Sequence, residues 1–244
     1  MNVDAVIAAN APYWGAEAEI CRTYFRSPGR SAESDARWIA RQAAKELLDG
    51  VVPRLRQLDR AIEGPDADAE AVAHLAEELH EEAAHLAAFA AAHRRIRPPG
   101  SAGLGRAELE VAVAWPGNLA LRDLRARHLQ ENAHLGAIAG SVSEGGCCAL
   151  FREGLALAGG SDADDAIAEA CGAVFADEAE HMLAGLRSVE ASTLSAEDWE
   201  VVVRMSVEQS RARLVMRDEQ FGGAVTAERL AELVASGSDP LLPG

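Results

Sequence analysis

Long segments without glycine or proline dominate this chain of 244 residues and limit the secondary structure open to it. Residues 67–95 contain neither residue type, and their apolar side chains recur with the 3.6-residue period of an α-helix. Glycine and proline cluster instead at 64–65, 98–100, 116–117 and 159–160, where they divide the chain. The apolar residues are rich in alanine and leucine, and only 5% of the chain is aromatic, which is typical of helices rather than strands. We therefore predict an all-α protein.

Local signals predict where the helices begin, end and bend. Gly50 and Pro53 interrupt a long helix over about residues 34–62, so we expect a kink near residue 50. After the turn at Gly64–Pro65, Asp66 is a candidate N-cap for the second helix. Besides a mixed lead-in over 1–32, the predicted segments are helices over 67–95, 118–158 with a disturbance at Gly145–Gly146, 162–189 capped by Ser161 or Asp162, 195–220, and from Thr226 to the tail at 236–244.

Charge and composition exclude several classes of protein. The chain carries 39 acidic and 23 basic side chains, a formal net charge of -16, which argues against nucleic acid and anionic membrane surfaces as partners. No apolar run approaches the 18 or more residues that a membrane span needs, and the N-terminus shows no signal peptide. The four cysteines do not form a disulfide framework. We expect a cytoplasmic protein.

Four of the seven histidines lie three residues after a glutamate. Residues at i and i+3 share a helix face, so a Glu oxygen and a His nitrogen can bind one ion. Mixed oxygen and nitrogen ligands suit iron or manganese. The four pairs are Glu77/His80, Glu82/His85, Glu131/His134 and Glu178/His181.

Position distinguishes these pairs. Glu82/His85 and Glu178/His181 lie within apolar stripes, where an unpaired carboxylate is unfavourable and a bound cation explains its presence. Glu77/His80 lies away from the stripe on its helix, and we assign it to solvent. Two inward-facing pairs on two helices therefore form the core of a predicted metal site.

This arrangement resembles the ferritin-like di-iron carboxylate superfamily, in which two Glu-x-x-His helices and one Glu from each of two other helices hold the metal. The resemblance covers residues 34–190 and implies a ferritin-like four-helix bundle with extra N-terminal and C-terminal helices. We expect a single domain over 1–244, in which 1–33 and 191–244 are peripheral helices and tail.

Hairpin geometry identifies the two remaining ligands. In an antiparallel pair of helices, two residues at the same height along the helix axis have sequence numbers that add up to a constant. By this rule Glu46 lies opposite His85. Glu144 lies about 3 Å along the axis from the residue opposite Glu178. The separations, 36 residues from Glu46 to Glu82 and 34 from Glu144 to Glu178, are nearly equal. The predicted set is Glu46, Glu82, His85, Glu144, Glu178 and His181. Two alternatives stay open: Asp49 in place of Glu46, and Glu131 with His134 in place of, or beside, Glu144.

The resemblance implies two iron ions, or a mixed iron and manganese pair, with dioxygen as co-substrate. Segments beyond a compact ferritin-type bundle favour an oxygenase or oxidase that acts on a small organic molecule. An electron-donor protein would dock on the acidic surface through a basic patch, and a homodimer is compatible with the sequence. The alternatives are an iron-storage ferroxidase, a helical scaffold without metal, and a haem-oxygenase-like di-metal oxidase, whose additional His is absent because position 174 is Val.

Overall fold

The computed structural model describes residues 2–64, 68–190, 194–223 and 226–236, and the side chains of 180–190 lie outside this description. The described residues form helices and turns without any strand, so the all-α prediction is confirmed. No helix in these ranges combines the length and hydropathy that crossing a bilayer requires. The elements are α1 (Val3–Phe25), α2 (Ala32–Lys45), the π-helix η1 (Glu46–Val51), α3 (Val52–Glu63), α4 (Ala69–Ile96), α5 (Arg106–Ala112), α6 (Pro116–Glu131), α7 (Ala133–Ser143), α8 (Gly145–Leu155), α9 (Asp162–Glu190), α10 (Ala196–Gln220) and α11 (Ala227–Ser236).

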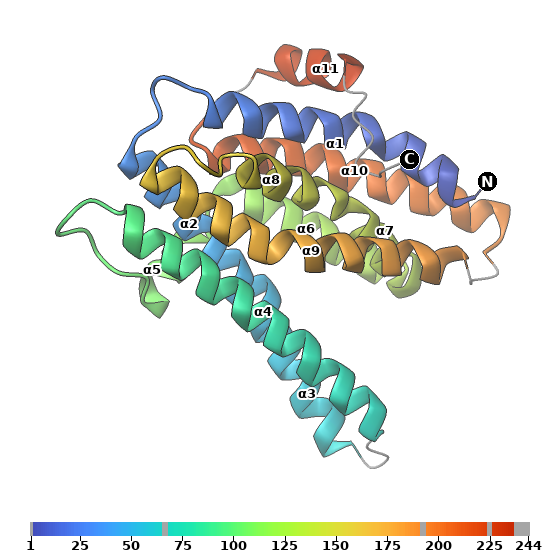
Figure 1. Ribbon diagram of the computed structural model, residues 1–244. Coiled ribbons are helices and arrows are strands. Elements are labelled where there is room, and N and C mark those ends of the chain that lie inside the picture. The colour runs from blue at the N-terminus through green and yellow to red at the C-terminus, as the bar shows by residue number, and fades with distance from the viewer. Residues whose placement is uncertain (1, 65–67, 191–193, 224–225, 237–244) are drawn as a thin grey trace. The chain divides into compact units, whose positions relative to one another are not determined.

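These elements divide into two compact units (Figure 1). Unit 1 comprises residues 1–30, 115–156 and 174–244, and unit 2 comprises residues 31–114 and 157–173. Helix α9 belongs to unit 2 as far as residue 173 and to unit 1 from residue 174. The single domain expected from the sequence stays a prediction.

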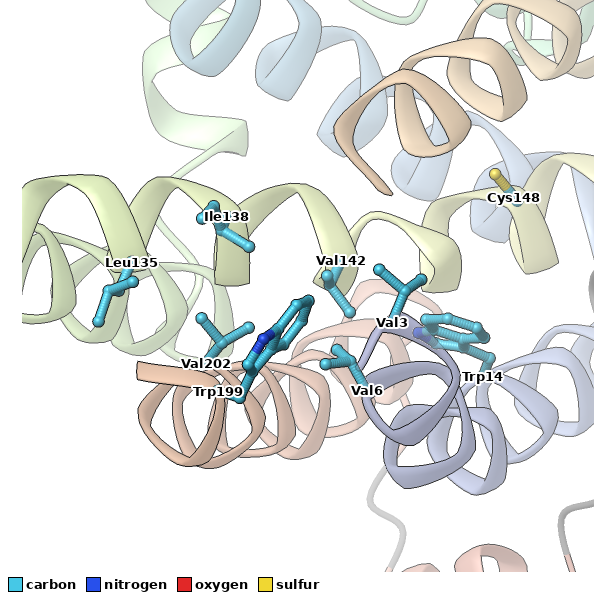
Figure 2. Packing of buried hydrophobic residues seen from close by; sticks show 9 residues of the cluster. All are labelled: Val3, Val6, Trp14, Leu135, Ile138, Val142, Cys148, Trp199 and Val202. Atoms are coloured by element: carbon cyan, nitrogen blue, oxygen red, sulfur yellow. The ribbon is translucent and has the colours of Figure 1, made fainter. Parts of the chain in front are cut away.

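The core of unit 1 includes a helix from the segment 1–32, for which the sequence predicts only a mixed lead-in. Residues 3–25 form helix α1, which lies beside α10 and also packs on α8 and α11 (Figure 1). Figure 2 shows the buried cluster, to which α1, α7, α8 and α10 all contribute. The ring of Trp14 is 1% exposed and approaches α8 closely, since a Cβ at Gly145 would lie 2.5 Å from it. Gly145, the first residue of α8, therefore has a packing role.

A buried ion cluster also links α1 to α10. The Glu17 side chain accepts hydrogen bonds from Arg213 Nη2 at 3.2 Å and Arg217 Nε at 2.7 Å, and all three side chains are at most 2% exposed. Arg213 Nη2 also donates to Cys147 Sγ at 3.1 Å. Gly146 leaves space for the carboxylate, because a Cβ there would lie 2.0 Å from Glu17 Oε2. Three helices thus meet at one buried carboxylate.

The charge of Glu17 makes the stability of the protein sensitive to acid. Burial raises the pKa of this carboxyl, but the guanidinium groups of Arg213 and Arg217 outweigh burial and hold the pKa below its ordinary value of 4.5. The stabilisation is therefore complete above about pH 4.5 and is lost as the pH falls through the lower pKa of the folded state. We expect the urea midpoint of the wild type to fall more steeply below pH 4.5 than that of Glu17→Gln. Equal slopes for the two proteins would contradict this assignment.

Unit 2 is built on α2 and α4, which pack against each other and against η1. Ser31 and Ser34 form a capping box at the start of α2. Trp38 of α2 and Phe89 of α4, both fully buried, meet edge to face with ring centroids 6.3 Å apart. Phe89 lies four residues, about one helical turn, after His85 on α4.

The caps were predicted in part. Ser161 and Ser195 accept hydrogen bonds from the backbone N–H groups three residues later, as expected for the caps of α9 and α10. Asp66 lies outside the described residues, and the N-cap of α4 is Asp68, whose side chain accepts from the N–H of Glu70.

The prediction of one helix over 118–158 is wrong in one respect, because the structure has three helices, α6, α7 and α8, in this part of the chain. The disturbance near Gly145 is present, with Glu144 between α7 and α8. An additional break falls at Asn132, which has extended backbone and caps α7 by accepting from the N–H of Leu135 at 3.1 Å. No glycine or proline marks this break, so the competing signal was the capping tendency of asparagine.

Candidate metal centre

Three residues of the predicted set converge in unit 2. Ligand atoms of Glu46 in η1 and of Glu82 and His85 in α4 all lie within 4.8 Å of one another. Glu82 and His85 share a face of α4 because they are three residues apart. Helix α4 packs on η1, which places Glu46 opposite that face.

The π-helix explains why Glu46 faces inward. The N–H of Val52 bonds to the carbonyl of Leu47, five residues earlier, in place of the four-residue spacing of an α-helix. Pro53 has no N–H to bond to the carbonyl of Asp49, so a regular turn is not available there. The kink expected near residue 50 is thus a single π turn, a local distortion that often occurs at functional sites.

Gly50 gives the Glu82 carboxylate its space. A Cβ at Gly50 would lie 2.1 Å from Glu82 Oε2, so the Glu82 carboxylate would have to move to admit it. The π turn and this glycine together let the carboxylate reach the backbone of η1 beside Glu46.

We predict that Gly50→Ala weakens metal binding about tenfold, since displacing a ligand-orienting group typically costs about 10- to 100-fold in affinity. The unfolding free energy of the metal-free protein should change little, because alanine favours the helix by up to about 1 kcal/mol and offsets the crowding. Gly140→Ala is the matched control, as a Cβ there meets nothing within 4 Å. Titration with Mn(II) and urea unfolding measure the two quantities. Equal metal affinities for the two variants would show that Gly50 does not position Glu82.

The buried carboxylate of Glu46 is held by one neutral donor. Gln42, four residues earlier on the same face, donates from Nε2 to Glu46 Oε1 at 2.6 Å, and both side chains are buried. Burial raises the pKa of Glu46, and Asp49 adds to this, while the hydrogen bond from Gln42 and the charges of His85 and Lys45 act the other way. The pKa remains above its ordinary value, so a cation beside Glu46 would favour the ionised form.

The spacing of Glu82 and His85 fits two ligands on one ion. Glu82 Oε2 lies 4.0 Å from His85 Nδ1, and the two side chains are 18% and 1% exposed. Carboxylate oxygens and imidazole nitrogens bind transition metals at about 2.0–2.2 Å, so two ligands of one ion lie up to about 4.4 Å apart. An ion between these atoms therefore needs only small side-chain adjustments.

The other three predicted ligands belong to unit 1. Glu144 stands between α7 and α8, and Glu178 lies on α9; both are partly buried. The pKa of the buried Cys148 thiol is raised by burial first, then by Cys147 and Glu178, with Glu144 acting in the same direction. Both carboxylates are therefore near Cys148. His181 is on α9, and its side chain lies outside the described residues. Convergence of all six residues stays a prediction.

The alternatives named from the sequence are all on the surface. Asp49 is exposed, whereas Glu46 is 6% exposed and joins Glu82 and His85. Glu131 is exposed in an ion pair with Arg204, and His134 is exposed on α7. Glu77 and His80 are exposed, as expected.

Sequence reasoning missed Gln42 and the role of Gly50. The i, i+4 spacing of Gln42 and Glu46 was a usable signal, because such residues are neighbours on a helix. The approach of Gly50 to Glu82 had no local signal, since it depends on how η1 and α4 pack.

The site is thus a group of two carboxylates and one imidazole from two adjoining elements of unit 2, in which Glu46 and His85 are buried and Glu82 is partly buried. Comparison of the chain with protein-family models, curated proteins and solved structures found no match.

Proposed function

We propose that Glu46, Glu82 and His85 hold a divalent iron or manganese ion and that the protein is an oxygen-dependent oxidoreductase acting on a small organic substrate. The observation that carries this proposal is the approach of three ligand atoms to within 4.8 Å of one another around a buried imidazole. Mixed oxygen and nitrogen ligands favour iron or manganese over magnesium or calcium, which prefer oxygen alone.

Charge balance supports a divalent ion. With a metal bound, the two carboxylates would carry a charge of about −2, which one divalent ion would neutralise in a region where unbalanced charge is unfavourable. Gln42 engages only one oxygen of Glu46 and so leaves the other to bind metal. The donor set and its surroundings therefore fit the ion.

Bound reduced iron would supply the electrons and the open coordination positions that dioxygen activation requires. Glu46, Glu82 and His85 would bind the ion, and Gln42 orients the carboxylate of Glu46. Phe89, 0% exposed and one helical turn beyond His85 on α4, would add an apolar side chain beside the site. A dry, fixed surrounding limits side reactions of an oxidising centre.

The resemblance to ferritin-like proteins extends the proposal to a four-helix bundle and a second ion, with Glu144, Glu178 and His181 as further ligands. Electrons for turnover would come from the substrate or from a donor protein that docks on the acidic surface.

The test is metal analysis of the full chain after anaerobic loading with Fe(II), followed by exposure to air. We expect one ion for the three-residue site, two for the complete centre, and oxygen consumption that depends on the bound iron. Absence of bound iron and manganese would overturn the proposal and favour a helical scaffold. Mineral formation in a hollow multimer would overturn the oxygenase assignment in favour of storage.

A further inference from the structure

The α3–α4 hairpin of unit 2 contains a long stretch of helix without any buried side chain. Helix α3 has none, and the first buried residue of α4 is His85. Residues 52–63 and 69–84, which belong to the helices labelled α3 and α4 in Figure 1, therefore lack a core of their own. Isolated helices of this length are marginal in water and gain most of their stability from packing of an amphipathic face.

One side of this hairpin is mostly apolar, and its polar members are Asp59, four residues after Leu55, and His80, four residues after Ala76. The contact between its helices includes Arg54, whose Nε lies 3.2 Å from Glu78 Oε2. Leu55 follows Arg54 by one residue, and Ala76 follows the partly buried Leu75 by one residue. Each step of one residue turns the side-chain direction by about 100° around the helix axis. Because the two helices are antiparallel, this turn carries Leu55 and Ala76 from the contact between the helices to the same side of the pair.

We define the hairpin face as Leu55 and Ile62 of α3 with Ala69, Ala76 and Ala83 of α4. Leu55 and Ile62 are 53% and 58% exposed, and the three alanines are exposed as well. Members of each group are seven residues apart, which keeps them on one side of their helix over two turns. Large side chains thus form one half of the face and small ones form the other.

We propose that this face binds the same face of a second copy of the chain. A two-fold axis parallel to the hairpin lays α3 of each copy on α4 of the other, antiparallel and at equal height. The Arg54–Glu78 pair shows that residues with numbers summing to about 132 lie at one height. Leu55 then fits over Ala76 of the second copy, and Ile62 over Ala69, so large groups meet small ones.

Charge complementarity favours this pairing. The exposed charges of α3 are two basic residues, Arg56 and Arg60, and two acids, Asp59 and Glu63, whereas the exposed acids of residues 69–84 are Glu70 and Glu77. Laying α3 on α4 of the second copy brings Arg56 next to Glu77, whose numbers sum to 133. Laying α3 on α3 would instead place leucine on leucine and arginine near arginine. The hairpin is therefore complementary to itself in one orientation, as a symmetric dimer requires.

The area is sufficient for a specific contact. Residues 69–84 extend about 24 Å at 1.5 Å per residue, and two helices side by side are about 20 Å wide. The flat area is roughly 500 Å² per copy, or about 1,000 Å² for the pair, the lower limit of a stable interface. We therefore expect a weak to moderate dimer.

Sedimentation velocity of the full chain at physiological ionic strength tests the proposal, since screening there limits repulsion between copies of charge -16. We expect a concentration-dependent dimer. Leu55→Glu with Ile62→Glu should raise the dissociation constant at least about 100-fold, as charges at the centre of an apolar interface do. Val111→Glu is the matched control, because Val111 is an exposed apolar residue (79%) of α5, away from the hairpin face, and its change should leave the dimer intact.

A charge exchange tests the orientation. Arg56→Glu should weaken the dimer about tenfold, and Arg56→Glu with Glu77→Arg should restore it. Circular dichroism checks that each variant remains helical. A monomeric wild type at all concentrations, or a dimer insensitive to the changes at Leu55 and Ile62, would overturn the proposal. Failure of the exchange to restore the dimer would overturn the antiparallel α3-on-α4 orientation.

Discussion

Replacing Glu82 and His85 with alanine should lower the affinity for Mn(II) or Fe(II) at least about 100-fold, because loss of two ligands exceeds the 10- to 100-fold effect of removing an outer partner. Calorimetric titration of the metal-free protein measures the change. The side chain of Glu82 is partly buried and that of His85 is buried, and both lie next to Glu46.

The chain provides a matched control on the same helix. Glu77 and His80 have the same spacing but are exposed, so Glu77→Ala with His80→Ala should bind metal as the wild type does. Glu82→Gln keeps the shape of the site while removing its charge, and separates loss of a ligand from loss of structure. Equal affinities for the Glu82/His85 and Glu77/His80 variants would place the metal elsewhere.

Replacing Glu17 with alanine should destabilise the protein by about 3–5 kcal/mol, the effect of removing one partner from a buried ion pair. Arg213 and Arg217, 1% and 0% exposed, would then be buried without their carboxylate. Urea unfolding measures the difference. Glu19→Ala is the control, because Glu19 is 41% exposed in its ion pair with Arg22 and should change stability by less than about 1 kcal/mol. Similar losses for both variants would argue against the buried cluster as a main source of stability in unit 1.

The positions that were predicted well share one property: their cause lies within a few residues. The caps Ser161 and Ser195 act on N–H groups three residues ahead. Gly50 and Pro53 disturb the helix in which they occur. The distinction between the buried His85 and the exposed His80 follows from the period of a single helix.

The positions that were missed depend on more distant contacts or on competing local preferences. The break at Asn132 carries no glycine or proline, and its extended backbone is accompanied by a cap on the following turn. Helix α1 falls in the mixed lead-in expected from the sequence, although Trp14 lies in a core with residues about 120 to 190 positions later in the chain. The periodicity of apolar residues along one helix does not reveal which distant helices will pack against it.

The amino-acid order therefore established that the described chain is helical, where α4, α9 and α10 begin and end, and which Glu-x-x-His pair of α4 faces inward. Packing established that Gln42 holds Glu46, that Gly50 admits Glu82, and that Glu17 meets Arg213 and Arg217. The physical reason is range. Helix periodicity, capping and i, i+4 pairing act within about four residues and can be read along the chain, whereas the Glu17 contacts join residues 196 and 200 positions apart and exist only after the helices have packed.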